Sequence, residues 1–255
     1  YSSDPNNSNK TWTFTTKSFA PATKALEYPM NDPNGVVVHE TIGNYNGTLI
    51  NPDDPNNVVN PWVPGLIGGS LLLDGINSYV DLGDAAPLPF GAGKAFSISA
   101  YFKTTDAEGP IIAYRNSTDA GDKIVCLAVG FNGAESDPGK LRYISRYNGN
   151  LLRMTGPEVN DGGWNHVALT RATDGTVSMF FNGVFAGSLN DNLAPYAFDL
   201  RSLGADLLWI SDGLGSETRR FLDGSIDTTT IWDGALKQSQ IDEMVNVIPY
   251  RLNPK

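Results

Sequence analysis

Residues 220–236 read RFLDGSIDTTTIWDGAL, a stretch typical of a strand that closes the core of a β-sheet. Its apolar, aromatic and β-branched positions are Phe221, Ile226, Thr228, Thr230 and Trp232. Residues of these kinds favour the pleated, half-buried environment of a strand. The dipeptide Asp223-Gly224 predicts a tight turn at the entrance to the strand. We therefore expect a closing core strand around which the rest of the chain packs.

A short helix is expected directly after this strand. Apolar residues recur there at helical spacing, at Leu236, Ile241, Met244 and Val245. Ser239, followed three residues later by Asp242, is similar to a capping box and indicates where the helix begins.

The composition favours short strands over helices elsewhere. The 255 residues include 27 glycines and 16 prolines, with many Asn and Asp residues in turn-forming pairs. Further strands are expected at residues 71–73, 79–82, 96–103, 110–114, 124–131, 141–146, 151–155, 165–171, 177–181, 184–187 and 207–210. Asn182-Gly183 predicts a tight hairpin. About a dozen short strands at this spacing indicate two packed antiparallel sheets.

Charge and hydropathy exclude several classes of function. The formal net charge is −10 and only 18 residues are Lys or Arg, so the chain lacks the basic footprint of a nucleic-acid-binding protein. No run of about 18 apolar residues occurs, which argues against insertion into a membrane. Cys126 is the only cysteine and is expected to be a small buried apolar residue.

Three segments resemble the laminin-G-like, concanavalin A-like lectin-glucanase superfamily. They are the FLDGSID and WDGAL parts of the closing stretch, GSLLLDGINSYVDLG at residues 69–83, and DGGWNHVALT at residues 161–170. The resemblance implies an all-β fold, a two-sheet antiparallel jelly-roll sandwich with one short C-terminal helix. The jelly-roll domain is expected to span residues 21–255.

Residues 1–20 stand apart from these segments. They contain TWTFTT, in which Trp12 and Phe14 alternate with threonines as in a half-buried strand. This ending is similar to the last strand of fibronectin-like or immunoglobulin-like modules. It is also consistent with an extra edge strand of the jelly roll, or with an arm (residues 1–16) that completes the sheet of a neighbouring subunit.

The sequence favours a protein that is not an enzyme. Glucanases of the superfamily carry alternating carboxylates, E-x-D-x-E, on one strand, and this chain has no such triplet. Its two histidines, His39 and His166, cannot form a three-histidine zinc site, and neither lies beside a nucleophile motif. His166 is expected to be a hydrogen-bonded structural residue. A pair of carboxylates brought together from distant strands stays open as an alternative.

Calcium is the one cofactor that the sequence favours. The 28 acidic residues include only seven glutamates, and many of the aspartates lie in turns beside Asn and Gly. The resemblance implies one calcium at the rim of the sandwich, held by Asp74, Asn77 and Asp227 with Asp32. The alternative is that Asp74 and Asp227 hydrogen-bond to turn amides.

The resemblance also implies recognition of a glycan through loops at the rim. The expected ligand-binding residues are Tyr114, Arg115, Arg146, Tyr147, Arg153 and Tyr196. Arg142, Arg146 and Arg153 lie close in sequence, and on paired strands two of them could share a face and hold an acidic sugar or carboxylate, or they could be solvated surface residues. Trp62 is expected to pack its loop in place rather than to stack on a sugar.

The leading hypothesis is a non-catalytic recognition or adhesion module, located outside the cell or on a cell or virion surface, that binds a glycan or a surface protein. The second is a structural subunit of a surface layer, filament or virion, joined to its neighbours through Trp12 and Phe14. The third is a polysaccharide-active enzyme.

Overall fold

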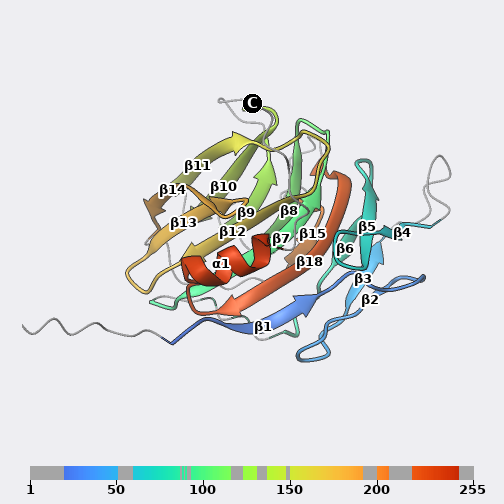
Figure 1. Cartoon of the computed structure of the whole chain (residues 1–255), viewed down its shortest axis with the longest axis horizontal. Coiled ribbons are helices and arrows are strands. Elements are labelled where there is room, and N and C mark those ends of the chain that lie inside the picture. The colour runs from blue at the N-terminus through green and yellow to red at the C-terminus, as the bar shows by residue number, and fades with distance from the viewer. Residues whose placement is uncertain are drawn as a thin grey trace, which may run out of the picture.

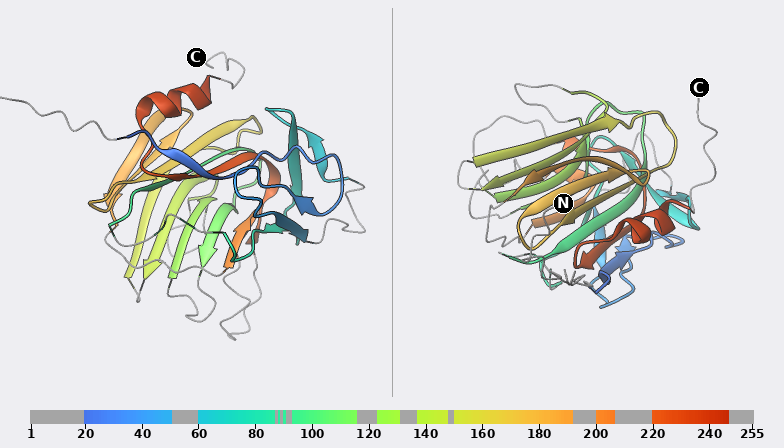
Figure 2. Two further views of the ribbon diagram at one scale, coloured as in Figure 1. Left: turned by 90° about the horizontal axis from the view of Figure 1, so that it is seen from below. Right: turned by 60° about the vertical axis from the view of Figure 1, so that its left-hand side comes forward.

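The structure is a computed structural model that describes residues 20–50, 60–86, 88, 90, 93–115, 123–130, 137–147, 150–191, 200–206 and 220–246. Within these residues the chain forms two large antiparallel sheets and one short helix (Figure 1). The two sheets lie face to face, as the turned views in Figure 2 show. The prediction of a two-sheet antiparallel jelly-roll sandwich with one helix near the C-terminus is therefore confirmed.

The first sheet, called sheet A, contains the closing strand. In spatial order its described strands are β14 (Val184–Asn190), β13 (Thr176–Phe181), β12 (Asn165–Arg171), β7 (Phe96–Lys103), β18 (Asp223–Asp233), β5 (Gly69–Asp74) and β4 (Trp62–Pro64), with β1 (Thr23–Tyr28) also paired to β18. The side chains of β7 alternate between the core and the outward face of sheet A. Ile98, Ala100 and Phe102 are fully buried in the core, whereas Ser97, Ser99, Tyr101 and Lys103 point to the other side.

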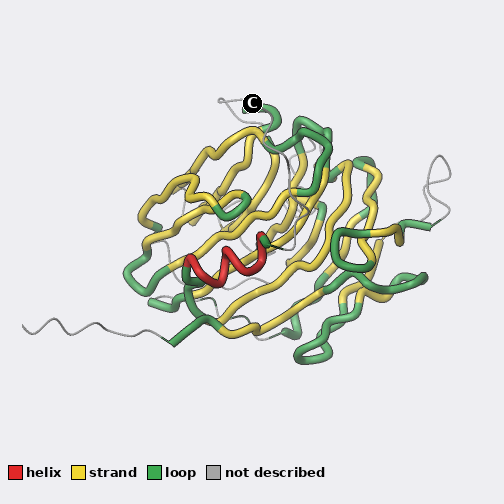
Figure 3. Tube along the Cα trace, viewed as in Figure 1, coloured by secondary structure: helices red, strands yellow, loops and turns green. Residues whose placement is uncertain are grey.

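The second sheet, called sheet B, covers the other side of the core. Its described strands are, in order, β11 (Asn150–Glu158), β10 (Lys140–Tyr147), β9 (Lys123–Val129), β8 (Gly109–Arg115), β15 (Leu200–Leu203), β6 (Tyr79–Asp81), β3 (Gly47–Ile50) and β2 (Val37–Val38). A small separate pair joins β16 (Ala205–Asp206) to β17 (Arg220–Phe221). Figure 3 shows how loops and turns connect the strands at the edges of the sandwich.

One hydrophobic core fills the space between the sheets. Alternate residues from both sheets, such as Phe102 and Ile226 from sheet A and Leu127 and Tyr143 from sheet B, are buried in it. Burial of each large apolar side chain contributes about 1.5–3 kcal/mol to the stability of the fold. Cys126 is buried as expected, although it lies outside this core with Ala128 on the other face of sheet B.

The closing strand β18 differs from its prediction at two points. Asp223-Gly224 does not form a turn but begins the strand, because both residues pair with β5. At Thr228 the backbone takes a left-handed conformation with φ of 37°, and the register with β7 shifts between Asp227 and Thr230. Before this bulge the neighbour of β18 is β5, and after it the neighbour is β1. Strands β5 and β1 therefore pair with the same edge of β18, one before the bulge and one after it.

Helix α1 (Gln238–Val245) lies on the outward face of sheet A, over β12 and β7 (Figure 1). It begins one residue before the predicted Ser239, because the backbone N–H of Lys237 donates to the Gln240 side chain at 3.2 Å. Ile241 is buried in a small cluster with Trp232 and Ala168, which fixes the helix on the sheet. No helix in the described part of the chain is long and apolar enough to span a membrane.

Most of the remaining strand predictions are confirmed within a few residues. The Asn182-Gly183 hairpin is confirmed by positive φ angles of 48° and 82°, the pattern that this turn requires. Trp62 packs as expected, with its indole N–H donating to the carbonyl of Gly35 at 2.9 Å. The strand expected at residues 207–210 lies outside the described residues.

Candidate functional site

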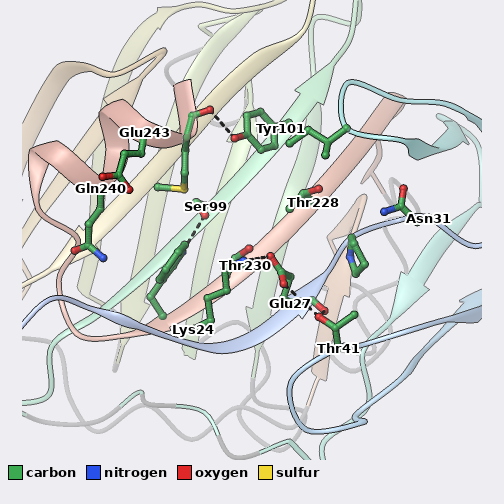
Figure 4. Close-up of a pocket in the computed structure, with 14 residues that line it drawn as sticks. Lys24, Glu27, Asn31, Thr41, Ser99, Tyr101, Thr228, Thr230, Gln240 and Glu243 are labelled. Atoms are coloured by element: carbon green, nitrogen blue, oxygen red, sulfur yellow. Dashed lines mark hydrogen bonds and ion pairs between the residues drawn. The ribbon is translucent and has the colours of Figure 1, made fainter. Parts of the chain in front are cut away.

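A groove of about 660 Å³ opens on the outward face of sheet A, between α1 and β1 (Figure 4). We call it the main groove. Its floor comes from β7 and β18, one wall comes from α1, and the opposite wall comes from β1 and the loops that follow it. The lining residues are Lys24, Glu27, Pro29, Asn31, Thr41, Ile67, Ser99, Tyr101, Thr228, Thr230, Trp232, Gln240, Glu243 and Met244.

The floor of the main groove follows from the register of β7 and β18. Ser99 lies opposite Thr230, and directly opposed residues in a sheet project to the same face. Because side chains alternate along each strand, Tyr101 and Trp232 also point away from the core. The floor therefore combines hydroxyl groups with two aromatic rings, and all four side chains are nearly buried, with Trp232 the most exposed of them at 9%.

Trp232 is held in place by polar contacts on two sides. Its indole N–H donates to the Ser99 hydroxyl at 2.9 Å, and the Lys24 ammonium lies 5.9 Å from the centre of the ring. Lys24 also forms an ion pair with Glu27 on the same strand. An indole that is fixed at its N–H, with an ammonium near its ring, is an amphipathic surface of limited mobility.

Tyr101 connects the groove floor to α1 and to a buried histidine. Its hydroxyl donates to the carbonyl of Met244 at 2.7 Å, and its ring lies 4.9 Å from that of His166. His166 is fully buried, and neither ring nitrogen has a hydrogen-bond partner within the described part of the chain. The prediction of a hydrogen-bonded ring is therefore wrong, and the ring packs beside that of Tyr101 instead. Burial lowers the pKa of His166 to about 4.

Asp227 is fully buried beside the main groove, next to the lining residue Thr228. Its carboxylate accepts the backbone N–H groups of Leu66 and Ile67, each at 2.8 Å, and the Thr228 hydroxyl at 2.8 Å. Burial raises the pKa of Asp227, and these hydrogen bonds oppose the shift. The carboxylate thereby anchors the loop of residues 65–69 to β18. Gly65 is required in this loop, since a Cβ there would lie 2.0 Å from the Gly69 carbonyl oxygen.

The charges of the main groove favour an uncharged ligand over an anionic one. Among the described lining residues Lys24 is the only cation, and it is paired with Glu27. Glu243 adds a second carboxylate from the exposed face of α1. An anionic group would enter this groove against net negative charge.

The four predicted calcium ligands do not form one donor set. One carboxylate oxygen of Asp74 accepts three backbone N–H groups, from Ile76, Asn77 and Ser78, at 2.8–3.0 Å. Asp74 pairs with Asp223 on β18. Asp227 is four residues farther along the same strand, so it lies roughly 13 Å from Asp74. Asp32 lies in another turn, where it accepts the N–H and contacts the ring of His39.

The alternative assignment, hydrogen bonds from Asp74 and Asp227 to backbone amides, is what the structure shows. The described residues contain no cluster of three His, Cys, Asp or Glu side chains that could hold a metal ion. The four residues therefore do not fit a shared calcium site. Calcium binding by this chain stays a prediction, and no step below depends on it.

The predicted rim residues separate into three groups. The prediction for Tyr114 is wrong. Tyr114 lies within β8 with its side chain buried in the core, and its ring centre lies 5.1 Å from that of Phe90. It therefore cannot contact a ligand from a loop. Arg115 ends β8 and Tyr147 ends β10. Tyr196, like Trp12 and Phe14 of the proposed assembly arm, lies outside the described residues.

The arginines of sheet B do share a face. Ile144 lies opposite Arg153, and Arg142 and Arg146 lie two residues to either side of Ile144 on β10. Arg153 is exposed, whereas Arg142 is buried and donates to Asp137 and to the Thr155 hydroxyl. The sequence predicted that two of the three arginines share a face, and all three do, but Arg142 is already engaged within the protein.

Sequence reasoning did not find the main groove. Its members come from residues 24–41, 67, 99–101 and 228–244, and only the fold brings these together. The available signal was the outward pattern Ser97, Ser99, Tyr101 on β7, in which hydroxyl-bearing side chains occupy the face opposite the core. Glu40 was also missed: its carboxylate accepts four backbone N–H groups, from Glu27, Ile42, Gly43 and Tyr45, and orders the loop beside β1.

Comparison with protein families agrees with this architecture. The family model described as "Concanavalin A-like lectin/glucanases superfamily" matches residues 74–242, which is more than half of the chain and includes the floor of the main groove. The chain belongs to this superfamily. In this member of the concanavalin A-like superfamily, the match begins at Asp74 and ends within α1. A search of curated proteins gave no match.

Solved structures show the same fold at low sequence identity. Domain 4 of AbnA, a GH43 extracellular arabinanase from Geobacillus stearothermophilus in complex with arabinotriose, is similar with a TM-score of 0.62 and 20% identity over 89% of this chain and 100% of that one.

The botulinum neurotoxin serotype D binding domain is similar with a TM-score of 0.60 and 15% identity over 88% of this chain. The binding domain of Paraclostridial Mosquitocidal Protein 1 gives 0.60 and 14% over 89%. This chain spans about half the length of these two binding domains, with 50% and 52% covered.

Proposed function

We propose that this concanavalin A-like chain is a non-catalytic recognition module that binds a carbohydrate in the main groove. The observation that carries the proposal is the floor: an anchored Trp232 lies beside the hydroxyls of Ser99 and Thr230. Sugars have apolar faces bordered by hydroxyl groups, so they pack on aromatic rings while their hydroxyls hydrogen-bond to polar neighbours. A volume of about 660 Å³ lies within the usual range for small-molecule sites.

The walls of the groove supply the rest of the recognition. Gln240 and Asn31 carry amides, and Glu243 carries a carboxylate, a strong acceptor for sugar hydroxyls. Because Lys24 is already paired with Glu27, the groove offers no free cation among its described residues for a sugar carboxylate or sulfate. A neutral sugar is therefore the preferred occupant.

The similar structures support a binding role. One is a domain of an extracellular arabinanase in complex with arabinotriose, and two are binding domains, one of a botulinum neurotoxin and one of a mosquitocidal protein. By analogy with them, the proposed partner of this chain is a glycan or a glycan-bearing surface protein. The chain would bind this partner outside the cell or at a cell or virion surface. The rim residues Arg146 and Arg153 provide the alternative location for such a partner.

The experiment is binding of the purified chain to an array of neutral and acidic glycans, followed by calorimetry with arabino-, xylo- and cello-oligosaccharides. Glu243→Ala removes a groove carboxylate, and Asp242→Ala is its matched control, since Asp242 is the neighbouring acid on α1 and does not line the groove. We expect Glu243→Ala to weaken binding about tenfold or more, as loss of a hydrogen bond to a charged group does, and Asp242→Ala to leave it unchanged.

A second pair of variants separates the groove from the rim. If Arg146→Ala and Arg153→Ala abolish binding while Glu243→Ala has no effect, the ligand binds at the rim and the groove assignment is wrong. If no glycan on the array binds, the carbohydrate proposal is wrong.

A further inference from the structure

A second groove of about 450 Å³ lies on the same outward face of sheet A. Its lining residues are Val63, Pro64, Leu72, Lys103, Thr104, Thr105, Gly162, Asp223, Gly224 and Ser225. They come from the last residues of β7, the first residues of β18, the β4–β5 hairpin and the turn that precedes β12. We call it the second groove.

The second groove continues the main groove along the same two strands. On β7 the outward side chains run from Ser99 and Tyr101, in the main groove, to Lys103 in the second. The register places Lys103 opposite Ser225, which also lines the second groove. One pleat of the strand separates Tyr101 from Lys103, about 7 Å along the sheet.

The loop of residues 65–69 is the boundary between the two grooves. Its Ile67 lines the main groove, and the residues just before it, Val63 and Pro64, line the second. Asp227 and Asn31 fix this loop, since the Asn31 side chain accepts the Gly69 N–H at 2.6 Å and Asp227 accepts the two amides described above. A chain-like ligand would pass over the exposed side chain of Ile67.

The two grooves share a lysine, hydroxyl groups and a carboxylate among their lining residues. In the main groove the Lys24 ammonium lies near the Trp232 ring, beside hydroxyls and a carboxylate. The second groove is lined by Lys103, by the exposed Thr105 and by the exposed Asp223, and the Lys103 ammonium lies 5.2 Å from the centre of the ring of Trp164, which does not itself line the groove. Repeated surface chemistry along one line suits a ligand made of repeated units.

We infer that the two grooves together receive one linear, neutral oligosaccharide, with successive sugar units in the main groove and in the second groove. This inference rests on the proposed function and extends it, because it specifies an unbranched chain rather than a single terminal sugar. The second groove acts as an additional subsite: its contacts add to those of the main groove once the oligosaccharide is long enough to reach Lys103.

The test is a length series measured by calorimetry. Linear arabino-, xylo- and cello-oligosaccharides from the disaccharide to the octasaccharide are titrated into the unaltered chain, Lys103→Met, Asp223→Ala and Glu243→Ala. Lys103→Met keeps the apolar stem beside Trp164 while it removes the ammonium, so the fold is expected to be retained. Circular dichroism and thermal unfolding verify this for each variant.

We expect affinity for one of these series to rise about tenfold or more when the oligosaccharide becomes long enough to fill both grooves. Lys103→Met and Asp223→Ala should remove this gain and leave the affinity for the shortest oligosaccharides unchanged, whereas Glu243→Ala should weaken binding at every length. An affinity that does not depend on length, with no effect of the second-groove variants, would overturn the inference and leave the proposed function standing. Absence of binding at every length would overturn both.

Discussion

The outward faces of the two sheets differ although both are built by the same alternation of side chains. On sheet A the strands β7 and β18 carry Ser99, Tyr101, Thr230 and Trp232, nearly buried polar and aromatic side chains that form the floor of the groove between α1 and β1. On sheet B the strands β8, β9 and β10 present small or apolar residues, and arginines follow toward β11. These small and apolar residues, all buried, are Ala113, Cys126, Ala128 and Ile144.

This difference decides which face can bind a neutral sugar. Sheet A combines an aromatic ring with hydroxyls and carries its charge as the Lys24–Glu27 pair and Glu243. On sheet B the buried cation Arg142 is engaged by Asp137 and Thr155, and the exposed cation is Arg153. The outward face of sheet A is therefore suited to uncharged polar ligands. The exposed Arg153 makes its part of sheet B better suited to anions.

The largest effect is expected from removal of the Asp227 carboxylate, which anchors the loop of residues 65–69. Asp227→Ala leaves two backbone N–H groups and one hydroxyl without their acceptor, and we expect it to lower the free energy of unfolding by about 3 to 5 kcal/mol. Urea denaturation measures this. On sheet B, Arg153→Ala is the matched control and should cost less than about 0.5 kcal/mol, since Arg153 is exposed. Equal costs for the two variants would contradict the anchoring role of Asp227.

The second effect concerns acid stability. The pKa of His166 is about 4 in the folded chain and about 6.5 in the unfolded chain, so the unfolded state binds the proton more tightly. The stability contributed by neutral His166 is complete above pH 6.5 and is lost as the pH falls toward 4, by about 3 kcal/mol in total.

His166→Phe isolates this contribution. The variant keeps a ring against Tyr101 and has no titrating nitrogen, so its unfolding free energy should fall about 3 kcal/mol less than that of the unaltered chain between pH 7 and 4. Denaturation curves at a series of pH values provide the comparison. Identical pH profiles for both chains would show that His166 is not buried in its neutral form.

A smaller effect is expected at the groove floor. Ser99→Ala removes the acceptor of the Trp232 indole N–H, and a buried donor without a partner costs about 1 to 3 kcal/mol of stability. The same variant should weaken binding of neutral oligosaccharides because Trp232 is no longer fixed. The control is Ser145→Ala on sheet B, which is buried away from both grooves and should not alter binding. An affinity that is unchanged in Ser99→Ala would place the ligand elsewhere.

The smallest effect is expected from a chelator. The carboxylates predicted to hold calcium are occupied by backbone amides, and none of the main-groove contacts requires a metal. EDTA should therefore change oligosaccharide affinity by less than about twofold, within the ordinary uncertainty of a binding measurement. Chelator-sensitive binding would show that calcium supports the ligand site.

Local patterns predicted the fold well and the main groove poorly. The alternation along β7 and the Asn182-Gly183 hairpin are properties of adjacent residues, so the sequence displays them directly. The main groove depends on contacts such as Lys24 with Trp232, which lie on strands brought together only when β1 pairs with β18. No periodicity within either segment reveals that contact.

Two residues show why the site was harder to predict than the fold. Tyr114 is expected at a ligand-binding rim, but strand β8 extends through Arg115 and directs its ring into the core. The resemblance implies a calcium ligand at Asp227, whose carboxylate accepts the backbone amides of residues 66 and 67, and calcium there stays a prediction. In both cases contacts with residues that are distant in the sequence determine the surroundings of the side chain.

The most direct test of the carbohydrate site is a nitrogen-15 NMR titration with the neutral oligosaccharide that binds best in calorimetry. The chain has five tryptophans, so five indole N–H signals are expected, and Ser99→Ala identifies that of Trp232 through the loss of its hydrogen bond. We predict that the Trp232 signal shifts on binding while the side-chain N–H signal of Arg153 stays in place. A shift of Arg153 with an unchanged Trp232 signal would contradict the assignment of the binding site to sheet A.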